Sequence, residues 1–523
     1  MRRSLVSRLN LLYRPLLGST MPYAYTSLRR SGAERLKALH SPPHPRLLLI
    51  AIPLLFCFFV SMRCSDGQGD LATVQAGYEG MLRAVLRNPV ATTSSWKDQL
   101  VHGQRYIISS AFGGQSNQFI IKHNLLYMAK HTNRTAVLPP FTAVHFDAAY
   151  RSTDEIFDLP RFYHLTGIRA VPLHRFKTAN DTSSVIDHLS CWALRHQARG
   201  PKHLPPDTNK FWRDYGFSLE YWMPYPFKKL GIGYDFAGIT AFLKNRTQQL
   251  EWVREVQRQL LPQIESKDGA PSPSPSIDTI APFYDPLHGI PPTDDDQVEC
   301  VDAIFYTSEF LVPRPPPVSA RAMPIYTQSW EEVGQYLHFV PELEAIADVY
   351  LMRLFAVSRP QDIPPFITVH IRRGDFSQAA PTSIIPAEGY IRALNEVRAR
   401  LQDRLDKPLT EDERHGRPVL QRFALTPSDY PVVFTTDAAV EVRQELELHG
   451  WKTIDHREYK TTATYGEWHP ALIDSIILAR GQAIVGTPFS TYSMLSGWRI
   501  ESWHGGIFAT ADAIPETRKG DAH

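Results

Sequence analysis

The chain has little net charge, and that charge is unevenly distributed. It holds 56 basic and 54 acidic residues among 523, a net charge of +2. Residues 1–46 contain nine basic residues and one acidic residue, a charge of +8; the rest, with 47 basic and 53 acidic residues, carries −6. Nucleic-acid-binding domains are usually basic. The mildly acidic body therefore argues against nucleic acid as the main partner.

Cysteine is also scarce, with only four residues in the chain: Cys57, Cys64, Cys191 and Cys300. In an oxidising compartment Cys191 and Cys300 could form one disulfide. Cys64 would then be left to link two chains as a disulfide-bonded dimer. The alternative is that Cys191 and Cys300 are buried free thiols.

One long apolar run is present, at residues 47–62, with the sequence LLLIAIPLLFCFFVSM. Sixteen helical residues reach about 24 Å, which is short of a ~30 Å hydrocarbon core but close to the thinner membranes of the early secretory pathway. A cleaved signal peptide is the rival interpretation. Because 46 residues precede the run, far more than a usual n-region, the sequence favours an uncleaved signal anchor.

The basic excess before this run predicts the orientation of the chain. Positive residues stay on the cytosolic side, so the amino end should be cytosolic and the body lumenal, as in a single-pass type II protein of the Golgi or endoplasmic reticulum membrane. A lumenal body would expose three N-x-[ST] glycosylation acceptors, at Asn133, Asn180 and Asn245.

Composition predicts two globular domains plus extensions, since a chain of 523 residues that is 43% hydrophobic can bury two cores. The expected segments are a cytosolic tail (1–46), the anchor (47–62), a polar stem (63–102), an N-terminal domain (103–330) and a C-terminal domain (331–523). A proline-rich stretch, 266–299, reads as an exposed insertion. Its acidic triplet, 294–296, favours solvated surface over a metal site, so we expect no bound metal.

The N-terminal domain opens with a strand, a glycine turn, a helix and a second strand. The strands are expected at 105–110 and 135–138, and the turn contains Gly113 and Gly114. This order is typical of a Rossmann-like domain, but the spacing is not GxGxxG, so no nicotinamide cofactor is indicated. Backbone N–H groups at the helix start could bind an anion or a sugar, assisted by Asn117 and Gln118. The alternative is a plain turn with Asn117 as a helix cap.

A second site is predicted where the segment FITVHIRRGDF, residues 366–376, ends. Its β-branched and aromatic residues indicate a buried strand, and open α/β sheets place ligands at the carboxyl ends of such strands. Arg372 and Arg373 follow directly. The guanidinium fork suits a diphosphate, and Gly374 would allow close approach of backbone. The alternative is that these arginines and Asp375 form ordinary surface ion pairs.

The rest of the C-terminal domain alternates between strands and helices at short intervals, which predicts a parallel sheet covered on both faces. Strands are expected at 432–436, 452–454 and 483–485, and helices at 388–405, 439–448, 469–480 and 491–499; a further helix, 330–355, precedes the central strand. Asp437 ends one strand and could bind guanine, although a helix cap is an equal alternative. After the last strand, Ser490, Thr491 and Ser493 open a helix that could meet phosphate oxygens.

Three of these segments, in this order, resemble the GDP-fucose protein O-fucosyltransferase family. They are HIRRGD (370–375), like the family's HxRRGD; GGQSNQ (113–118), like GGxxNQ; and STYS (490–493), like STFS with Tyr492 in place of phenylalanine. The resemblance implies an α/β protein of the GT-B arrangement, in which two Rossmann-like domains face a cleft and the C-terminal domain holds the nucleotide.

The resemblance also implies the reaction: transfer of L-fucose from GDP-fucose to a serine or threonine of a secretory-pathway protein, with inversion and without a metal or other cofactor. It makes Arg372 the catalytic group. GDP-fucose would be bound by Gly113, Gly114, Asn117, Gln118, His370, Arg372, Asp437, Ser490, Thr491 and Ser493. An N-glycan or other oligosaccharide is the alternative acceptor.

A second class of function stays open, that of a lumenal GDP-sugar-binding protein without turnover. Some family members carry a glutamate base soon after the glycine motif, whereas residues 119–122 are Phe, Ile, Ile and Lys here. The general base is therefore unassigned.

Overall fold

The computed structural model describes residues 68–511, except for the following: 112, 145, 180–184, 194–211, 213, 225–235, 253, 256–296, 302–303, 307–326, 375–383, 410–417 and 439. Several predicted features lie outside this part of the chain: the apolar run, Cys64, Asn180, the acidic triplet and Asp375. None of the helices in the described part has the length and hydropathy needed to span a bilayer. The described residues from Gly69 onward belong to one compact unit.

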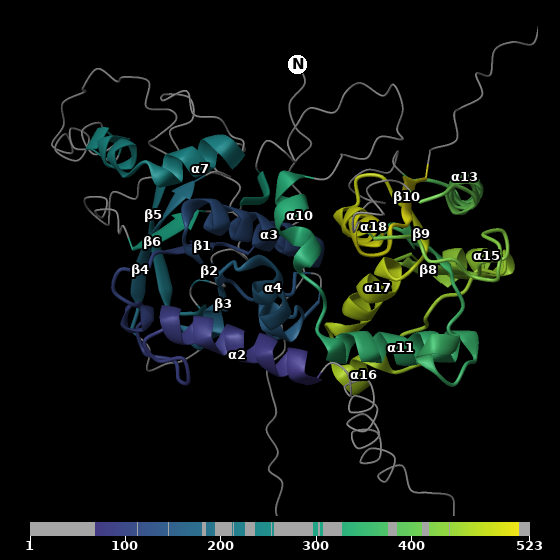
Figure 1. Cartoon of the computed structure of the whole chain (residues 1–523), viewed down its shortest axis with the longest axis horizontal. Helices are drawn as coiled ribbons and strands as arrows, with labels where there is room; N and C mark the ends of the chain where they lie inside the picture. Colours follow the sequence, from purple (N-terminus) through teal and green to yellow (C-terminus); the bar gives the residue numbers. More distant parts are fainter. Residues whose placement is uncertain are drawn as a thin grey trace, which may run out of the picture. The chain divides into compact units, whose positions relative to one another are not determined.

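The N-terminal sheet has six strands in the order β3-β2-β1-β6-β4-β5, and all neighbouring pairs are parallel. It is drawn in blue and teal in Figure 1. β1 and β2 are buried along their whole length, as expected for parallel strands covered on both faces. The strands are β1 (Tyr106–Ser109), β2 (Thr135–Leu138), β3 (Ala170–Pro172), β4 (Asp187–Ala193), β5 (Phe217–Pro224) and β6 (Val298–Val301).

The helix after the glycine turn, α3 (Gln115–Thr132), is buried continuously from Gln118 to Ala129. It contacts both β1 and β2, and α7 and α10 also pack against it. Other helices of this half include α4 (Leu159–Thr166), α7 (Phe236–Lys244), α10 (Gln328–Glu332) and the 3-10 turns η1 (Trp96–Gln99), η2 (Thr153–Glu155), η3 (Leu173–Arg175), η7 (Ile304–Tyr306) and η8 (Gly334–Tyr336).

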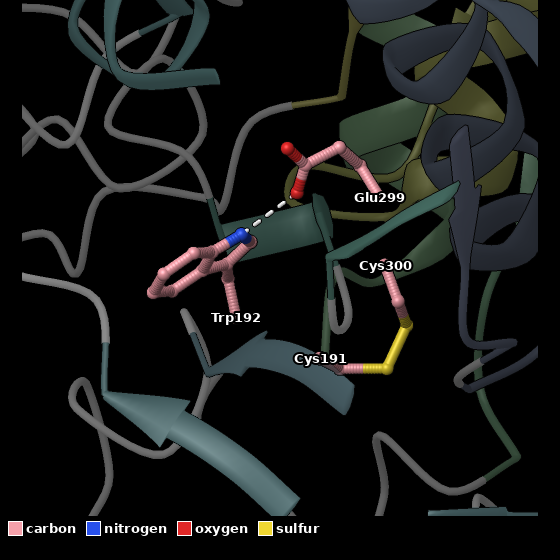
Figure 2. The surroundings of a disulfide bond; sticks show 4 residues. All are labelled: Cys191, Trp192, Glu299 and Cys300. Atoms are coloured by element: carbon pink, nitrogen blue, oxygen red, sulfur yellow. Dashed lines mark hydrogen bonds between the residues drawn. A yellow bond between two sulfur atoms is a disulfide. The ribbon is translucent and has the colours of Figure 1, made fainter. Parts of the chain in front are cut away.

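The proline-rich insertion was predicted to end at residue 299, which is too late in the chain. Its last residues enter β6, which lies between β1 and β4 in the middle of the sheet. Cys300 of β6 is directly opposite Cys191 of β4, and the two form a disulfide (Figure 2). The free-thiol alternative is therefore wrong. Beside the disulfide, the indole of Trp192 donates to the buried carboxylate of Glu299 at 2.9 Å.

Residues 63–102 were expected to form a polar stem, but from Gln68 onward the chain belongs to the folded N-terminal half. Residues 68–85 form α2 (Gln68–Val85), whose Met81, Leu82 and Val85 lie in the core. The hydroxyl of Tyr78 donates to the Ala170 carbonyl of β3 at 3.1 Å. The physical reason is burial: the apolar residues recur at helical spacing on one face, and the N-terminal half covers that face.

The C-terminal sheet has four parallel strands in the order β10-β9-β7-β8, drawn in green and yellow in Figure 1. They are β7 (Ile367–Ile371), β8 (Val432–Thr436), β9 (Ala483–Gly486) and β10 (Ile507–Thr510). The helices are α11 (Pro341–Phe355), α13 (Ala387–Asp406), α15 (Val440–Leu448), α16 (Thr461–Tyr465), α17 (His469–Ala479) and α18 (Thr491–His504), with the 3-10 turn η9 (Pro360–Asp362).

The α/β class and the strand–helix alternation of this half are confirmed, with three differences. The helix expected at 330–355 is broken into α10, η8 and α11, because Pro341 starts a new helix rather than continuing one. The expected strand at 452–454 is a single bridge from Lys452 to Val433. β10 was not predicted. The expected domain boundary at 330/331 falls inside α10.

Tryptophan side chains join the two halves. Trp330 of α10 donates its indole N–H to Ser502 of α18 at 2.9 Å and lies against Trp498. Trp468 donates to the carbonyl of Ala149 at 2.9 Å. The Trp330 contacts hold α18 against the N-terminal half, and the start of α18 is one part of the candidate site.

Candidate active site

The carboxyl end of β7 is the centre of the candidate site. All five residues of the strand are buried, between β8 on one side and β9 on the other. Arg372 follows immediately, and Asp437 follows β8 in the same way. Because parallel strands end at one edge of the sheet, the two side chains meet there as an ion pair.

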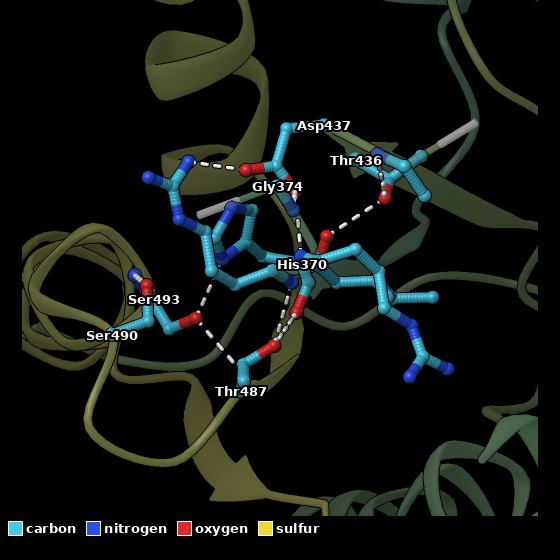
Figure 3. Close-up of polar contacts among 11 residues, drawn as sticks. His370, Gly374, Thr436, Asp437, Thr487, Ser490 and Ser493 are labelled. Carbon is cyan, nitrogen blue, oxygen red and sulfur yellow. Dashed lines mark hydrogen bonds and ion pairs between the residues drawn. The ribbon is translucent and has the colours of Figure 1, made fainter. Parts of the chain in front are cut away.

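The carboxylate of Asp437 collects three donors from the Arg-Arg-Gly turn (Figure 3). It accepts the guanidinium of Arg372, the backbone N–H of Arg373 at 2.6 Å and that of Gly374 at 3.0 Å. A Cβ on Gly374 would lie 2.5 Å from an Asp437 oxygen, so only glycine permits this approach. One guanidinium and two N–H groups converging on one anion form an anion-binding nest.

Asp437 was expected to bind guanine or to cap a helix. In this structure its carboxylate accepts hydrogen bonds from donors that were expected to bind phosphate. The N–H of the next residue, Ala438, is bonded to Thr436 at 3.1 Å. Arg373 points elsewhere, donating to the Ile385 carbonyl at 2.6 Å.

His370 lies inside the sheet edge, with only 5% of its surface exposed. Its Nδ1 is 2.6 Å from the hydroxyl of Ser493, and its ring packs against Tyr492. Burial lowers the pKa of His370 to about 4; Asp437 opposes this shift and Arg372 adds to it. The imidazole is therefore neutral at neutral pH and can meet a phosphate only as a hydrogen-bond donor.

The hydroxyls at the start of α18 are largely engaged within the protein. Ser490 is the N-cap of the helix and accepts the N–H of Ser493 at 3.3 Å. The Ser493 hydroxyl is fully buried and accepts the N–H of Thr487 at 2.9 Å. Thr491 is partly exposed, and its hydroxyl donates to Asn117 Oδ1 at 2.9 Å.

This bond brings the glycine turn of the N-terminal half to the same place. Gly113 has a φ of +69°, and a Cβ there would lie 2.6 Å from Asn117 Nδ2. Gly114 is the N-cap of α3 and offers no side-chain cap. The alternative of Asn117 as a helix cap is therefore wrong. Its partly exposed amide contacts the C-terminal half.

Gln118 differs from its expected role. Its side chain is fully buried, and its amide donates to the carbonyls of Gly113 at 2.7 Å and Thr142 at 2.8 Å. Its oxygen accepts the N–H of Thr142 at 2.8 Å. Both amide hydrogens are thus used to hold the glycine turn, which makes Gln118 a support for the site.

Two further residues at this edge were given no role of their own in the sequence analysis. Thr487 and Tyr390 are both buried, and their hydroxyls lie 2.7 Å apart. Tyr390 is on α13, far along the chain from the motifs. Thr487 stands beside the predicted hydroxyl cluster, and a threonine directly after a buried strand was the available signal.

Among the residues that the structure describes, no three His, Cys, Asp or Glu side chains are grouped as metal ligands. A sequence model of one family, described as GDP-fucose protein O-fucosyltransferase, matches residues 106–499, more than half of the chain. The chain belongs to the GDP-fucose protein O-fucosyltransferase family. It is a GDP-fucose-dependent fucosyltransferase.

Solved structures of fucosyltransferases are similar to this family member at low identity. POFUT1 in complex with GDP-fucose is 14% identical, with a TM-score of 0.42 over 80% of this chain and 99% of that one. POFUT1 with GDP is 14% identical, with a TM-score of 0.40 over 80% and 99%. NodZ from Bradyrhizobium is 11% identical, with a TM-score of 0.31 over 75% and 92%. No curated protein matches the chain.

Proposed function

We propose that this fucosyltransferase moves L-fucose from GDP-fucose to a serine or threonine hydroxyl of a secretory-pathway protein, with inversion and without a metal ion. One observation supports the proposal most: the guanidinium of Arg372 and two backbone N–H groups converge on a single carboxylate at the end of β7. The same donors suit the β-phosphate of GDP.

In this mechanism Asp437 occupies the phosphate position before the donor binds. The Arg372 and Asp437 side chains are 27% and 29% exposed, so water and ligand can reach the pair. GDP-fucose would displace the carboxylate from the guanidinium. As the bond from fucose to GDP breaks, negative charge grows on the β-phosphate, and Arg372 stabilises that charge.

Metal independence is proposed on the chemistry of Arg372. A guanidinium stays protonated at any physiological pH and offers two parallel N–H donors to a phosphate. It can therefore fill the role that a divalent cation fills in other glycosyltransferases. The acidic triplet at 294–296 is outside the described residues and has no part in the proposal.

The N-terminal half contributes Asn117, held beside Thr491, so that the donor would lie between two Rossmann-like halves in the GT-B arrangement. An acceptor hydroxyl would attack the anomeric carbon from the side opposite GDP, and a single displacement of this kind inverts the configuration.

The test uses the purified full-length protein in detergent. GDP release from GDP-fucose would be measured with folded secretory domains, N-glycans or no acceptor, each with EDTA or manganese. We expect release with a protein acceptor, unchanged by EDTA. Transfer to an N-glycan alone would replace the acceptor class, and inhibition by EDTA that manganese reverses would overturn metal independence. Binding of GDP-fucose without turnover by any acceptor would indicate an inactive binding protein.

We also propose that the apolar run at 47–62 anchors the protein as a type II protein of the Golgi or endoplasmic reticulum membrane, with the body in the lumen. The Cys191–Cys300 disulfide supports this location, because such bonds persist in oxidising compartments. Protease should spare the body in sealed microsomes, and its digestion would contradict the topology. Non-reducing gels of Cys64→Ser and wild-type protein would test for a dimer linked through Cys64.

A further inference from the structure

Thr487 lies directly after β9 and next to the ion pair of Arg372 and Asp437. It is 2% exposed. Its hydroxyl donates to the carbonyl of His370 at 2.9 Å and accepts the backbone N–H of Arg372 at 2.8 Å. The third neighbour is the Tyr390 hydroxyl at 2.7 Å. Figure 3 shows hydrogen bonds from Thr487 both to the end of β7 and to Ser493.

The bonding capacity of this hydroxyl is fully used. A threonine hydroxyl has one hydrogen and two lone pairs. The hydrogen goes to His370, one lone pair receives Arg372, and the other receives Tyr390, which must then be the donor. The Thr487 backbone N–H is bonded as well, to Ser493 at 2.9 Å.

The position of Thr487 explains why β7 needs it. The β7–β9 ladder ends with the pair Val369 and Val485, two residues before Ile371 and Thr487 respectively. Beyond that pair, the Thr487 side chain takes the place of ladder bonds by holding His370 O and Arg372 N. On the other side of the strand, Thr436 donates to the Ile371 carbonyl at 2.7 Å. Arg372 is thus fixed at its backbone, just where the sheet stops.

We propose that Thr487 is a positioning residue for the reaction, holding the Arg372 backbone so that its guanidinium meets the β-phosphate of the leaving GDP. The inference rests on the proposed role of Arg372 and adds a residue that the family motifs do not include. A small displacement of a charge-stabilising group is enough to lower the rate, because such groups act only at the correct distance.

Four variants test the contribution of the Thr487 hydroxyl separately from that of its partner Tyr390. Thr487→Val removes the hydroxyl and leaves the bonds of His370, Arg372 and Tyr390 unmade. Thr487→Ala does the same but leaves room for a water molecule, and it serves if the valine variant fails to fold. Thr487→Ser keeps the hydroxyl. Tyr390→Phe removes one bond to the same hydroxyl without touching Arg372.

The measurements are kcat and KM for GDP-fucose, Kd for GDP, and Tm, all on full-length protein and per folded molecule. For Thr487→Val or Thr487→Ala we expect kcat to fall about tenfold or more while KM changes little, since the interaction is strongest in the transition state. The affinity for GDP should also fall, because the β-phosphate of free GDP carries the negative charge that the Arg372 guanidinium would bind. Thr487→Ser should restore kcat. Tyr390→Phe leaves both bonds from Thr487 to β7 in place, so it should lower Tm and reduce kcat less than Thr487→Val does.

A lower Tm with wild-type kcat and wild-type GDP affinity in both Thr487→Val and Thr487→Ala would show a merely structural role and overturn the proposal. So would a Thr487→Ser variant as impaired as Thr487→Ala. If the wild-type protein transfers no fucose, the proposed function fails by itself. The GDP affinities of the same variants then still decide whether Thr487 positions Arg372.

Discussion

Two ion pairs of the N-terminal half are far more deeply buried than the ion pair at the candidate site. In the N-terminal half, Arg134 pairs with Glu299 and Lys177 with Asp187, and all four side chains are at most 3% exposed. In the C-terminal half, the Arg372–Asp437 pair is more than a quarter exposed. Separating a buried ion pair leaves a charge buried without its partner, which is strongly unfavourable. In an ion pair that water can reach, a ligand anion can replace the carboxylate. We therefore expect the two buried pairs to stabilise the fold and the Arg372–Asp437 pair to bind the ligand.

The Lys177–Asp187 pair is closed by further hydrogen bonds. Asp187 accepts the Ser95 hydroxyl at 2.5 Å and the Trp96 N–H at 2.9 Å, besides the Lys177 ammonium at 2.9 Å. The ammonium also donates to the carbonyls of Val185 at 2.7 Å and Gly216 at 3.0 Å. These bonds tie the segment before β1 to the sheet, in a region that was expected to be stem.

The largest effect should come from breaking this pair. Asp187→Ala leaves the Lys177 charge buried, which typically costs about 3–5 kcal/mol of unfolding free energy. Chemical denaturation measures the loss. Fucose transfer per folded molecule should stay at the wild-type level. A stable Asp187→Ala protein with lost turnover would reverse the assignment and give the N-terminal charges a functional role.

The opposite result is expected for Arg372→Ala. Removing the guanidinium should lower kcat by on the order of 10²-fold or more while the unfolding free energy changes little. Arg372→Lys should also be impaired, because the ammonium keeps the charge but loses the fork. Arg359→Ala is the matched control: Arg359 bonds to Asp362 at 2.8 Å on the exposed surface. An active Arg372→Ala enzyme would remove the central claim.

Acid should weaken both halves, since each buries a neutral histidine. Burial lowers the pKa of His370 to about 4 and that of His123, in α3, to about 3. Above pH 6.5 these groups are neutral in folded and unfolded protein alike, so they do not change stability. Below it the unfolded chain binds protons that the folded chain does not, and stability falls with pH until the folded pKa is reached.

For His370 alone, the loss between pH 6.5 and pH 5 should be roughly 2 kcal/mol. Denaturation of wild type and His370→Asn at several pH values measures it, and the variant should have the shallower pH dependence. Parallel curves would show that folding does not lower the pKa of His370.

The C-terminal half was the easier one to predict from the sequence. Its strands and helices alternate at short intervals, and local apolar patterns suffice to place them; β8 was predicted at its true bounds. The N-terminal sheet depends on distant pairings. β6 lies between β1 and β4 although about 190 residues separate it from β1, and no local pattern reveals such a partner.

Within the site, the motifs identified the right residue types but not their partners. Asn117 and Thr491, predicted from separate motifs, contact each other. Gln118, Ser490 and Ser493 are bonded to other protein groups. A motif shows that a hydroxyl or amide is present, but whether its hydrogen is free for a ligand depends on neighbours from other elements. Thr487 and Tyr390 were given no role of their own for the same reason.

The smallest effect, and the sharpest test of how the N-terminal half contributes, compares two asparagines of α3. Asn117 meets Thr491 at the partly exposed start of the helix. Asn124 is fully buried, donates to the Ile304 carbonyl at 3.0 Å and accepts from Ser329 at 2.8 Å. Asn117→Ala should keep its Tm and lose about tenfold in kcat/KM for GDP-fucose, because a donor-side hydrogen bond is lost.

Asn124→Ala should lower Tm, since it leaves two buried groups without their bonds, and keep kcat/KM per folded molecule. The two variants share residue type and helix, so a difference between them reflects position alone. If Asn117→Ala lost stability and kept its turnover, the N-terminal half would be a scaffold without a donor contact. The substrate would then be bound by the C-terminal half alone.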